Sequence, residues 1–181
     1  MPQELEVLRI VTGRLESVGI RYMVTGSVAA NYYAVPRMTR DIDLVVELAA
    51  EDADRLCALF EGDFYVDREA VRSAIAGRTA FNLIHTGWVL KVDFVVRKDS
   101  AYRREEFGRR RQVTIDDMAL FVVAPEDLII SKLDWARDTR SEIQLGDVRN
   151  LLTGVPDLDR EYLTRWVTRL GLESLYQEVT G

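Results

Sequence analysis

The chain has 181 residues, of which 48% are hydrophobic and 30% charged, a balance typical of globular proteins that fold throughout. Its formal net charge of −6 argues against a protein that coats DNA nonspecifically. With one cysteine, Cys57, and one histidine, His85, the chain has no internal disulfide and too few soft ligands for a zinc site. Any metal is therefore expected to be a hard cation bound by carboxylates.

The sequence shows no sign of membrane insertion or export. No apolar run approaches the roughly 18 residues of a membrane span, and the first ten residues lack the basic and then apolar order of a signal peptide. We therefore expect a cytoplasmic protein with no membrane partner, and its length fits one domain or two small ones.

The chain up to residue 124 carries alternating helix and strand patterns. Apolar residues at mixed spacings of three and four predict helices, whereas β-rich runs bounded by turn residues predict strands and, around Thr86-Gly87, an antiparallel hairpin. The predicted helices are 2–18, 28–34, 51–60 and 67–77, and the predicted strands are 21–25, 41–47, 64–66, 81–85, 89–96, 112–115 and 120–123.

From Pro125 onward the pattern is helical throughout. Helical spacing is found in residues 125–140, 142–152 and 159–179, with few β-branched runs. The expected fold class is α/β (α+β), with a sheet core over residues 1–124 and a C-terminal helical module over residues 125–181 packed on it.

Two aspartates on one predicted strand and one on another carry the strongest chemical signal. Asp41 and Asp43 alternate with apolar residues, so both side chains point to the same face of the strand, and Mg²⁺ or Mn²⁺ would relieve their repulsion. Asp93 lies in an apolar strand, where a charge needs a partner. If the two strands are neighbours, three carboxylates converge, as in sites that hold two metals for phosphoryl or nucleotidyl transfer. The alternative is a solvated strand edge.

Gly26 and Ser27 lie where a predicted strand meets a predicted helix. Free backbone N–H groups and the helix dipole at such a junction form a natural phosphate cradle. Taken alone, Gly26 is better explained as a turn residue and Ser27 as a helix cap. Together with the carboxylates they indicate a nucleotide site.

The stretch GSVAANYYAVPRMTRDIDLVV, residues 26–46, resembles the signature of the polymerase-beta-like nucleotidyltransferase superfamily. Asp93 in KVDFVV matches its third acid. The thirteen residues between Ser27 and Asp41, with Arg37 and Thr39 before the acids, resemble the AbiEii branch, which includes toxins of type IV toxin–antitoxin pairs. Residues 125–140 and GDVRNLL (146–152) resemble the second conserved region of that branch, so the resemblance covers roughly residues 20–152.

The resemblance implies a nucleotidyltransferase-like mixed sheet flanked by helices, with the catalytic core in residues 1–124. The implied reaction is Mg²⁺- or Mn²⁺-dependent transfer of a nucleoside monophosphate from an NTP, such as ATP, to an acceptor hydroxyl. The implied metal ligands are Asp41, Asp43 and Asp93, which are catalytic together with Lys132. The implied nucleotide-binding residues are Gly26, Ser27, Arg37, Thr39, Lys132 and Asp147. The chain departs from the family at Asn150, where a second aspartate is common.

The resemblance also suggests an acceptor, the 3′ end of tRNA or another RNA, and a toxin role opposed by a cognate antitoxin. Alternatives are a protein-AMPylating enzyme, a non-catalytic nucleotide-binding module with the same fold, and a metal-dependent nuclease. The sequence identifies neither the NTP nor the oligomeric state.

Several residues have a structural explanation beside the functional one. Lys132 fits a triphosphate-neutralising cation, but equally a snorkelling lysine or an ion pair with Asp127 or Asp134, and Asp147 fits a surface acid. Residues 97–111 contain seven basic and three acidic residues, which suits either an RNA-binding patch with Tyr102 or Phe107 stacking on a base or a solvated helix with ion pairs. We expect His85 and Cys57 to be structural.

Overall fold

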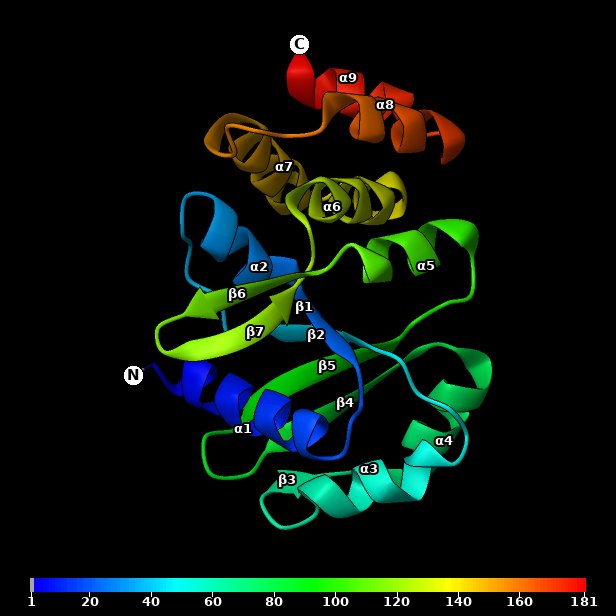
Figure 1. Ribbon diagram of the computed structural model, residues 1–181. Helices are drawn as coiled ribbons and strands as arrows, with labels where there is room; N and C mark the ends of the chain where they lie inside the picture. The colour runs from blue at the N-terminus through cyan, green and yellow to red at the C-terminus, as the bar shows by residue number, and fades with distance from the viewer. Residues whose placement is uncertain (1) are drawn as a thin grey trace.

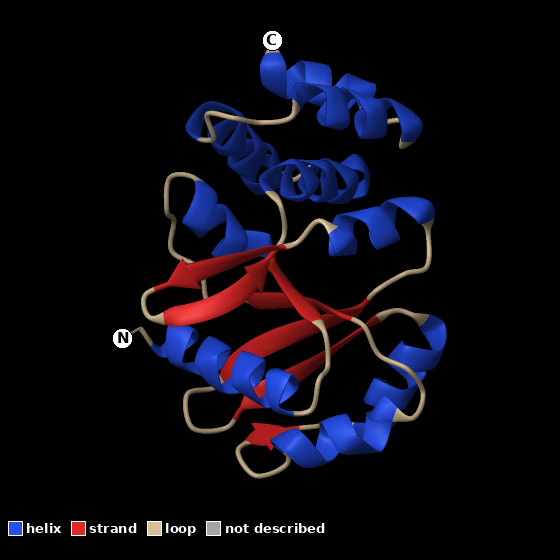
Figure 2. Ribbon diagram, viewed as in Figure 1, coloured by secondary structure: helices blue, strands red, loops and turns tan. Residues whose placement is uncertain are grey.

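In the computed structural model, which describes residues 2–181, seven strands join a single mixed sheet with helices packed around it (Figure 2). The strands are β1 (Tyr22–Thr25), β2 (Ile42–Val46), β3 (Phe64–Tyr65), β4 (Ala80–His85), β5 (Leu90–Val96), β6 (Arg111–Ile115) and β7 (Met118–Val122). The helices are α1 (Gln3–Ser17), α2 (Gly26–Tyr33), α3 (Asp52–Phe60), α4 (Arg68–Gly77), α5 (Ala101–Gly108), α6 (Pro125–Thr139), α7 (Glu142–Gly154), α8 (Arg160–Arg169) and α9 (Glu173–Thr180).

The strand order is β3-β4-β5-β2-β1-β7-β6. β2 pairs with β5 in parallel and with β1 antiparallel, while β4 and β5 form the predicted antiparallel hairpin. β6 and β7 pair antiparallel at the other edge, also as predicted. The strand that carries Asp93 therefore lies beside the strand that carries Asp43, which was the condition for their carboxylates to meet.

Alternation along the central strands separates the core from the site. On β2, Ile42, Leu44 and Val46 are fully buried, whereas the residues between them are only partly buried. β5 repeats the pattern, and its Phe94 packs edge-on against Phe60 of α3. Because successive strand residues point to opposite faces, Asp43 and Asp93 share the face opposite this apolar layer.

Most of the helices gather at two ends of the sheet, while α1 runs across the front of it (Figure 1). α3 and α4 lie together at one end, and α6 to α9 are stacked at the other, with α2 between them and the sheet. The chain enters α6 directly from β7 through the fully buried residues Val123 and Ala124. The division at residue 124 into two units stays a prediction.

The elements differ from the sequence predictions in several places. α5 lies where a helix was one of two explanations for residues 97–111, and β7 begins at Met118, two residues before its predicted start. The predicted helix over 159–179 is two helices, α8 and α9, because Gly171 between them adopts a φ of 67°, a left-handed conformation that ends a helix. The helix predicted from Val28 begins two residues earlier, at Gly26. Within residues 2–181, none of the helices combines the length and the apolar character that crossing a membrane requires.

Candidate active site

Two aspartates face each other at the centre of the sheet. Asp43 of β2 and Asp93 of β5 are direct partners in the parallel register. The same row continues to Thr25 of β1 on one side and to Asn82 of β4 on the other. Parallel pairing of β2 and β5 thus brings together two carboxylates that are fifty residues apart in the sequence.

The backbone at the start of α2 presses against one of these carboxylates. Gly26 has a φ of 63°, and a Cβ atom placed on it would lie 2.0 Å from Oδ2 of Asp43. Glycine is therefore required here for its left-handed conformation and for lack of a side chain. The contact places the carboxylate of Asp43 beside the first turn of the helix.

The charges around Asp43 are unbalanced in favour of a cation. Burial, followed by the negative charges of Asp93 and Asp41, raises the pKa of Asp43 above its ordinary value of 3.8. Lys91 Nζ lies 2.7 Å from Oδ2 of Asp93, and this hydrogen bond raises the pKa of the lysine. Sequence analysis did not single out Lys91, although its position two residues before Asp93 places it on the same strand face.

Asp41 lies closer to the surface than Asp43 does. Asp41 is exposed, and its backbone N–H donates to Oγ1 of Thr39 at 3.3 Å. Among residues 2–181, no three His, Cys, Asp or Glu side chains are close enough to form a metal site. The expected convergence of three carboxylates is therefore not seen among these residues: Asp43 and Asp93 are paired, and the charge of Asp41 contributes to the raised pKa of Asp43.

The donors present still suit a hard divalent cation. They are carboxylate oxygens, which Mg²⁺ prefers. Burial and the charges of Asp93 and Asp41 raise the pKa of Asp43 despite the opposing effects of Lys132 and Lys91, so a cation bound between Asp43 and Asp93 would relieve the repulsion between the carboxylates.

A second group of predicted residues meets at the N-terminal end of α2. Arg37 forms a two-pronged ion pair with Asp147, at 3.0 Å from Nε to Oδ1 and 3.1 Å from Nη2 to Oδ2. Its Nη2 also donates to Ser27 Oγ at 2.7 Å. Asn31 holds the Arg37 loop in place by accepting from its backbone N–H and donating to its carbonyl. Sequence analysis did not identify Asn31.

Lys132 belongs to the same group. Its Nζ donates to Asp147 Oδ2 at 2.8 Å and to Gln144 Oε1 at 2.9 Å. Both Lys132 and Asp147 are buried, with 4% and 6% of their side chains exposed, so neither a snorkelling lysine nor a surface acid describes them. The suggested pairing of Lys132 with Asp127 or Asp134 is wrong.

The group carries a net positive charge, because Arg37 and Lys132 share the one carboxylate of Asp147. Burial raises the pKa of Asp147, but its hydrogen bonds to Arg37 and Lys132 outweigh burial, so the pKa lies below 3.8. Asn150, one turn further along α7, is exposed. The departure from the AbiEii-like pattern at residue 150 therefore falls on the solvent side of the helix.

The basic segment 97–111 is largely neutralised within the protein. Arg103 pairs with Glu106 and Asp134, and Arg109 bonds Glu126 and Asp127. Tyr102 and Phe107 are only 4% and 3% exposed, so the proposal that either one stacks on a base is wrong. The ion-paired helix is the better description of this segment.

The two remaining sequence assignments are structural. Cys57 is buried among core residues of α3. His85 is buried at the end of β4, where its ring stacks on Trp88 and contacts Phe64 edge-on. Both residues lie outside the row of carboxylates.

Comparison of the sequence with protein-family models and with curated proteins gives no significant match. Solved structures do match. The antibiotic-resistance factor ANT(2'')-Ia is 15% identical, with a TM-score of 0.62 over 97% of each chain. An antigenic nucleotidyltransferase-like protein from Paracoccidioides brasiliensis is 21% identical, with a TM-score of 0.56 over 97% of this chain and 93% of its own.

A third structure extends the pattern. The lincosamide antibiotic adenylyltransferase LnuA is 13% identical, with a TM-score of 0.54 over 84% of this chain and 97% of its own. Identities this low establish architecture rather than activity. The chain therefore has the nucleotidyltransferase fold.

Proposed function

We propose that this chain is a cytoplasmic, NTP-dependent nucleotidyltransferase that moves a nucleoside monophosphate to an acceptor hydroxyl and releases pyrophosphate. The observation that carries the proposal is the position of the Asp43 carboxylate. It lies against Gly26 at the start of α2 and opposite Asp93 on the neighbouring strand. The proposed phosphate site and the proposed cation site are thus next to each other.

The first turn of α2 supplies the phosphate site. Thr25, the residue before the helix, makes no side-chain capping bond, and the turn contains no acidic residue, so the free N–H groups and the helix dipole favour an anion. The guanidinium of Arg37 donates hydrogen bonds both to the Asp147 carboxylate and to the Ser27 hydroxyl oxygen. In this proposal the β- and γ-phosphates bind at Gly26 and Ser27, and Arg37 and Lys132 stabilise the departing pyrophosphate.

Asp43 and Asp93, assisted by Asp41, would hold Mg²⁺ or Mn²⁺. When bound, the cation would neutralise charge on the carboxylates and phosphates and lower the pKa of the acceptor hydroxyl. Thr39 fixes the backbone of Asp41 and so positions this carboxylate at the rim of the site.

The chain's residues then order a single displacement. The acceptor oxygen forms a bond to the α-phosphorus as the bond from that phosphorus to the bridging oxygen breaks, and pyrophosphate leaves with the bonding electrons. The hydroxyl proton passes to the Asp93 carboxylate, whose Oδ2 is held by Lys91. The products are the nucleotidylated acceptor and pyrophosphate.

The acceptor we favour is an RNA 3′ hydroxyl, such as that of tRNA, which would make the chain a toxin controlled by an antitoxin. Support comes from the resemblance of residues 26–46 and 125–152 to the AbiEii branch. The buried pairing of Lys132 with Asp147 gives both residues of its second conserved region a defined place beside α2.

A small-molecule hydroxyl is the second candidate. This chain matches ANT(2'')-Ia almost from end to end, and one structure of that protein holds adenylyl-2''-tobramycin with a TM-score of 0.60 to this chain. A core of this size is thus compatible with a compact acceptor.

The test is to incubate the protein with each α-labelled NTP and Mg²⁺, separately with total bacterial RNA, cell protein and aminoglycosides. Label in tRNA-sized RNA, absent with Asp41→Ala/Asp43→Ala, is the expected result. Label in a small molecule or in protein would identify that molecule, in place of RNA, as the acceptor. Metal-dependent NTP binding without transfer to any acceptor would contradict the proposal and favour a non-catalytic nucleotide-binding module.

A further inference from the structure

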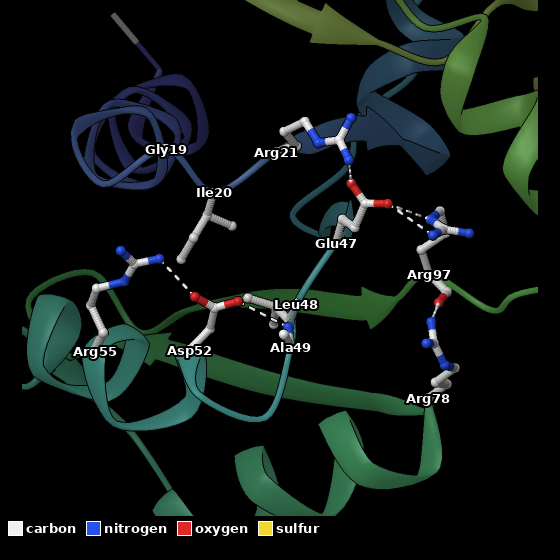
Figure 3. A pocket seen from close by; sticks show the side chains of 10 residues that line it. All are labelled: Gly19, Ile20, Arg21, Glu47, Leu48, Ala49, Asp52, Arg55, Arg78 and Arg97. Atoms are coloured by element: carbon white, nitrogen blue, oxygen red, sulfur yellow. Dashed lines mark hydrogen bonds and ion pairs between the residues drawn. The ribbon is translucent and has the colours of Figure 1, made fainter.

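A pocket of about 460 Å³ lies beyond the ends of the central strands, away from the carboxylates (Figure 3). It is lined in part by the loop that joins α1 to β1 and by the segment that joins β2 to α3. Its charged lining consists of four arginines and two acids: Arg21, Arg55, Arg78, Arg97, Glu47 and Asp52. Four positive and two negative side chains leave an excess of two positive charges.

Sheet register brings these side chains together. Tyr22 pairs with Val46, and Val46 with Val96, so the next row holds Arg21, Glu47 and Arg97. Glu47 N–H donates to the Arg21 carbonyl and Arg97 N–H to the Val46 carbonyl, which extends the ladder by one row. Arg78 lies two residues before the start of β4, and its Nη1 donates to the Arg97 carbonyl at 3.0 Å.

The carboxylates of the pocket are used to hold arginines in position. Glu47 pairs with Arg21 through one oxygen and with Arg97 through the other, the latter at 2.8 Å. Arg97 is only 12% exposed, so this pair is a fixed base for the pocket. Asp52 pairs with Arg55 at 2.6 Å. In Figure 3 Glu47 lies between Arg21 and Arg97, and Asp52 lies beside Arg55.

Arg78 has a backbone conformation that arginine does not favour. It ends α4 with a φ of 50°, a left-handed conformation that glycine or asparagine adopts at lower cost. Its side chain is bonded to a carbonyl and to no carboxylate in the contacts that the structure shows. An arginine held at this position supplies a charge to the pocket that a better helix-ending residue would not.

The pocket and the carboxylates belong to the same two strands. Glu47, the residue after β2, follows Asp43 by four residues, and Arg97, the residue after β5, follows Asp93 by four residues, a separation of about 13 Å along the strand direction. Because residues four apart in a strand share a face, the alternating series that carries Asp43 and Asp93 leads through Val45 and Val95 to Glu47 and Arg97.

We propose that this arginine pocket is a phosphate-binding subsite, and that the acceptor carries phosphate groups which bind there while its hydroxyl reaches Asp43 and Asp93. The ligand chemistry is a phosphate monoester or diester, which arginine recognises through paired N–H groups. The identification of the ligand as the acceptor rests on the proposed function. The proposal that the pocket binds phosphate is independent of the proposed function.

The experiment compares two double variants with equal loss of charge. Arg55→Gln/Arg78→Asn removes the two pocket arginines that do not pair with Glu47, and asparagine suits the left-handed conformation at residue 78. The matched control is Arg72→Gln/Arg140→Asn, because Arg140 also ends a helix with a φ of 49° and both arginines are exposed. Neither pair lies in the candidate active site.

Binding is measured without NTP or Mg²⁺, with inorganic phosphate and with a short single-stranded RNA bearing a free 3′ hydroxyl. Phosphate is followed by NMR at the amides of Gly19, Ile20 and Ala49, which line the pocket. We expect Kd to rise on the order of tenfold in the pocket variant and to stay unchanged in the control. For RNA we also expect the salt dependence to weaken by about 1.4 units of slope, about 0.7 for each of the two arginines removed.

The two ligands separate the possible sources of phosphate. Weaker binding of both identifies a nucleic-acid backbone, and weaker binding of phosphate alone identifies a small phosphate-bearing molecule as the occupant. Equal phosphate binding by the pocket and control variants would overturn the proposal. A chain that binds phosphate in the pocket but transfers no nucleotide to any acceptor would contradict the proposed function and leave the subsite in place.

Discussion

The backbone of Gly26 and the carboxylate of Asp43 touch so closely that no other amino acid fits between them. A Cβ atom at residue 26 would overlap Oδ2, Cγ and Cβ of Asp43, the last at 2.9 Å. The overlap with Cβ matters most, since it lies near the backbone of β2 and cannot move away by rotation of the side chain. The start of α2 and the centre of β2 are thus fixed relative to each other.

Gly26→Ala should therefore damage both the fold and the site. We expect a loss of about 2–4 kcal/mol in the free energy of unfolding, from the left-handed conformation and the overlap together, and strongly reduced NTP binding. Urea denaturation measures the first and nucleotide titration the second. The control is Gly146→Ala in α7, where nothing lies within 4 Å of the added Cβ and a gain of about 0.5–1 kcal/mol is expected. Equal stabilities of the two variants would contradict the contact.

Asp43→Asn should abolish transfer and stabilise the metal-free protein. The substitution removes a partly buried negative charge that faces Asp93 and Asp41, so we expect the melting temperature to rise, by about 2–4 °C for each kcal/mol gained. Mg²⁺ should raise the melting temperature of the wild-type protein, because a ligand that binds the native state stabilises it.

The same additions should have little effect on Asp43→Asn, whose site has lost one of its two facing carboxylates. Calorimetry with and without Mg²⁺ tests this pair of expectations. A wild-type melting temperature that stays unchanged when Mg²⁺ or Mn²⁺ is added together with NTP would argue against a cation at Asp43 and Asp93.

Asp147→Asn should destabilise the protein at neutral pH by about 3–5 kcal/mol, because it leaves the buried ammonium of Lys132 without a counter-ion. The pKa of Asp147 is lowered in the folded state, so its contribution to stability is complete above the unfolded value of about 3.8 and is lost as pH falls through the folded value. Urea denaturation from pH 7 to pH 3 should show the difference between the two proteins narrowing below about pH 4, by at most about 1 kcal/mol at pH 3. A constant difference would contradict the ion pair.

Tyr162→Phe tests how α8 is attached. The Tyr162 hydroxyl donates to Oδ1 of Asp127 at 2.5 Å, and the other oxygen of that fully buried carboxylate accepts from Arg109. Removing the hydroxyl leaves one carboxylate oxygen without its donor, at an expected cost of about 1–3 kcal/mol. Tyr65→Phe on the exposed short strand β3 is the control and should change stability by less than about 0.5 kcal/mol. Thermal denaturation of both variants provides the comparison.

Local patterns in the sequence were enough to predict most strands and helices. Alternation of Ile42, Leu44 and Val46 with acids defined β2, and Thr86-Gly87 placed the hairpin of β4 and β5. The helix after Ser27 was found because Pro36 marks its end. Gly171 was misjudged, since helical spacing continues across it and only its left-handed conformation separates α8 from α9.

Contacts between distant residues were beyond such patterns. Arg37 and Asp147 are 110 residues apart, and nothing local to either indicates their ion pair; only the family resemblance placed both near a nucleotide. Tyr102 was misassigned because helical periodicity does not say which side of α5 faces the core. The arginine pocket was missed for a similar reason, as its charges come from four separate segments that only the strand order β4-β5-β2-β1 and the packing of α3 bring together.

The alternation along β2 also limits how related chains can vary in length. A one-residue insertion after Ile42 would turn Asp43 into the apolar core and bring Leu44 to the surface of the site, because each step along a strand reverses the side chain's direction. Natural insertions and deletions should therefore accumulate in the segment between α2 and β2, before Asp41, while the spacing from Asp41 to Val46 stays invariant. The segment before this strand can therefore vary in length among related chains, whereas the number of residues in the strand itself cannot.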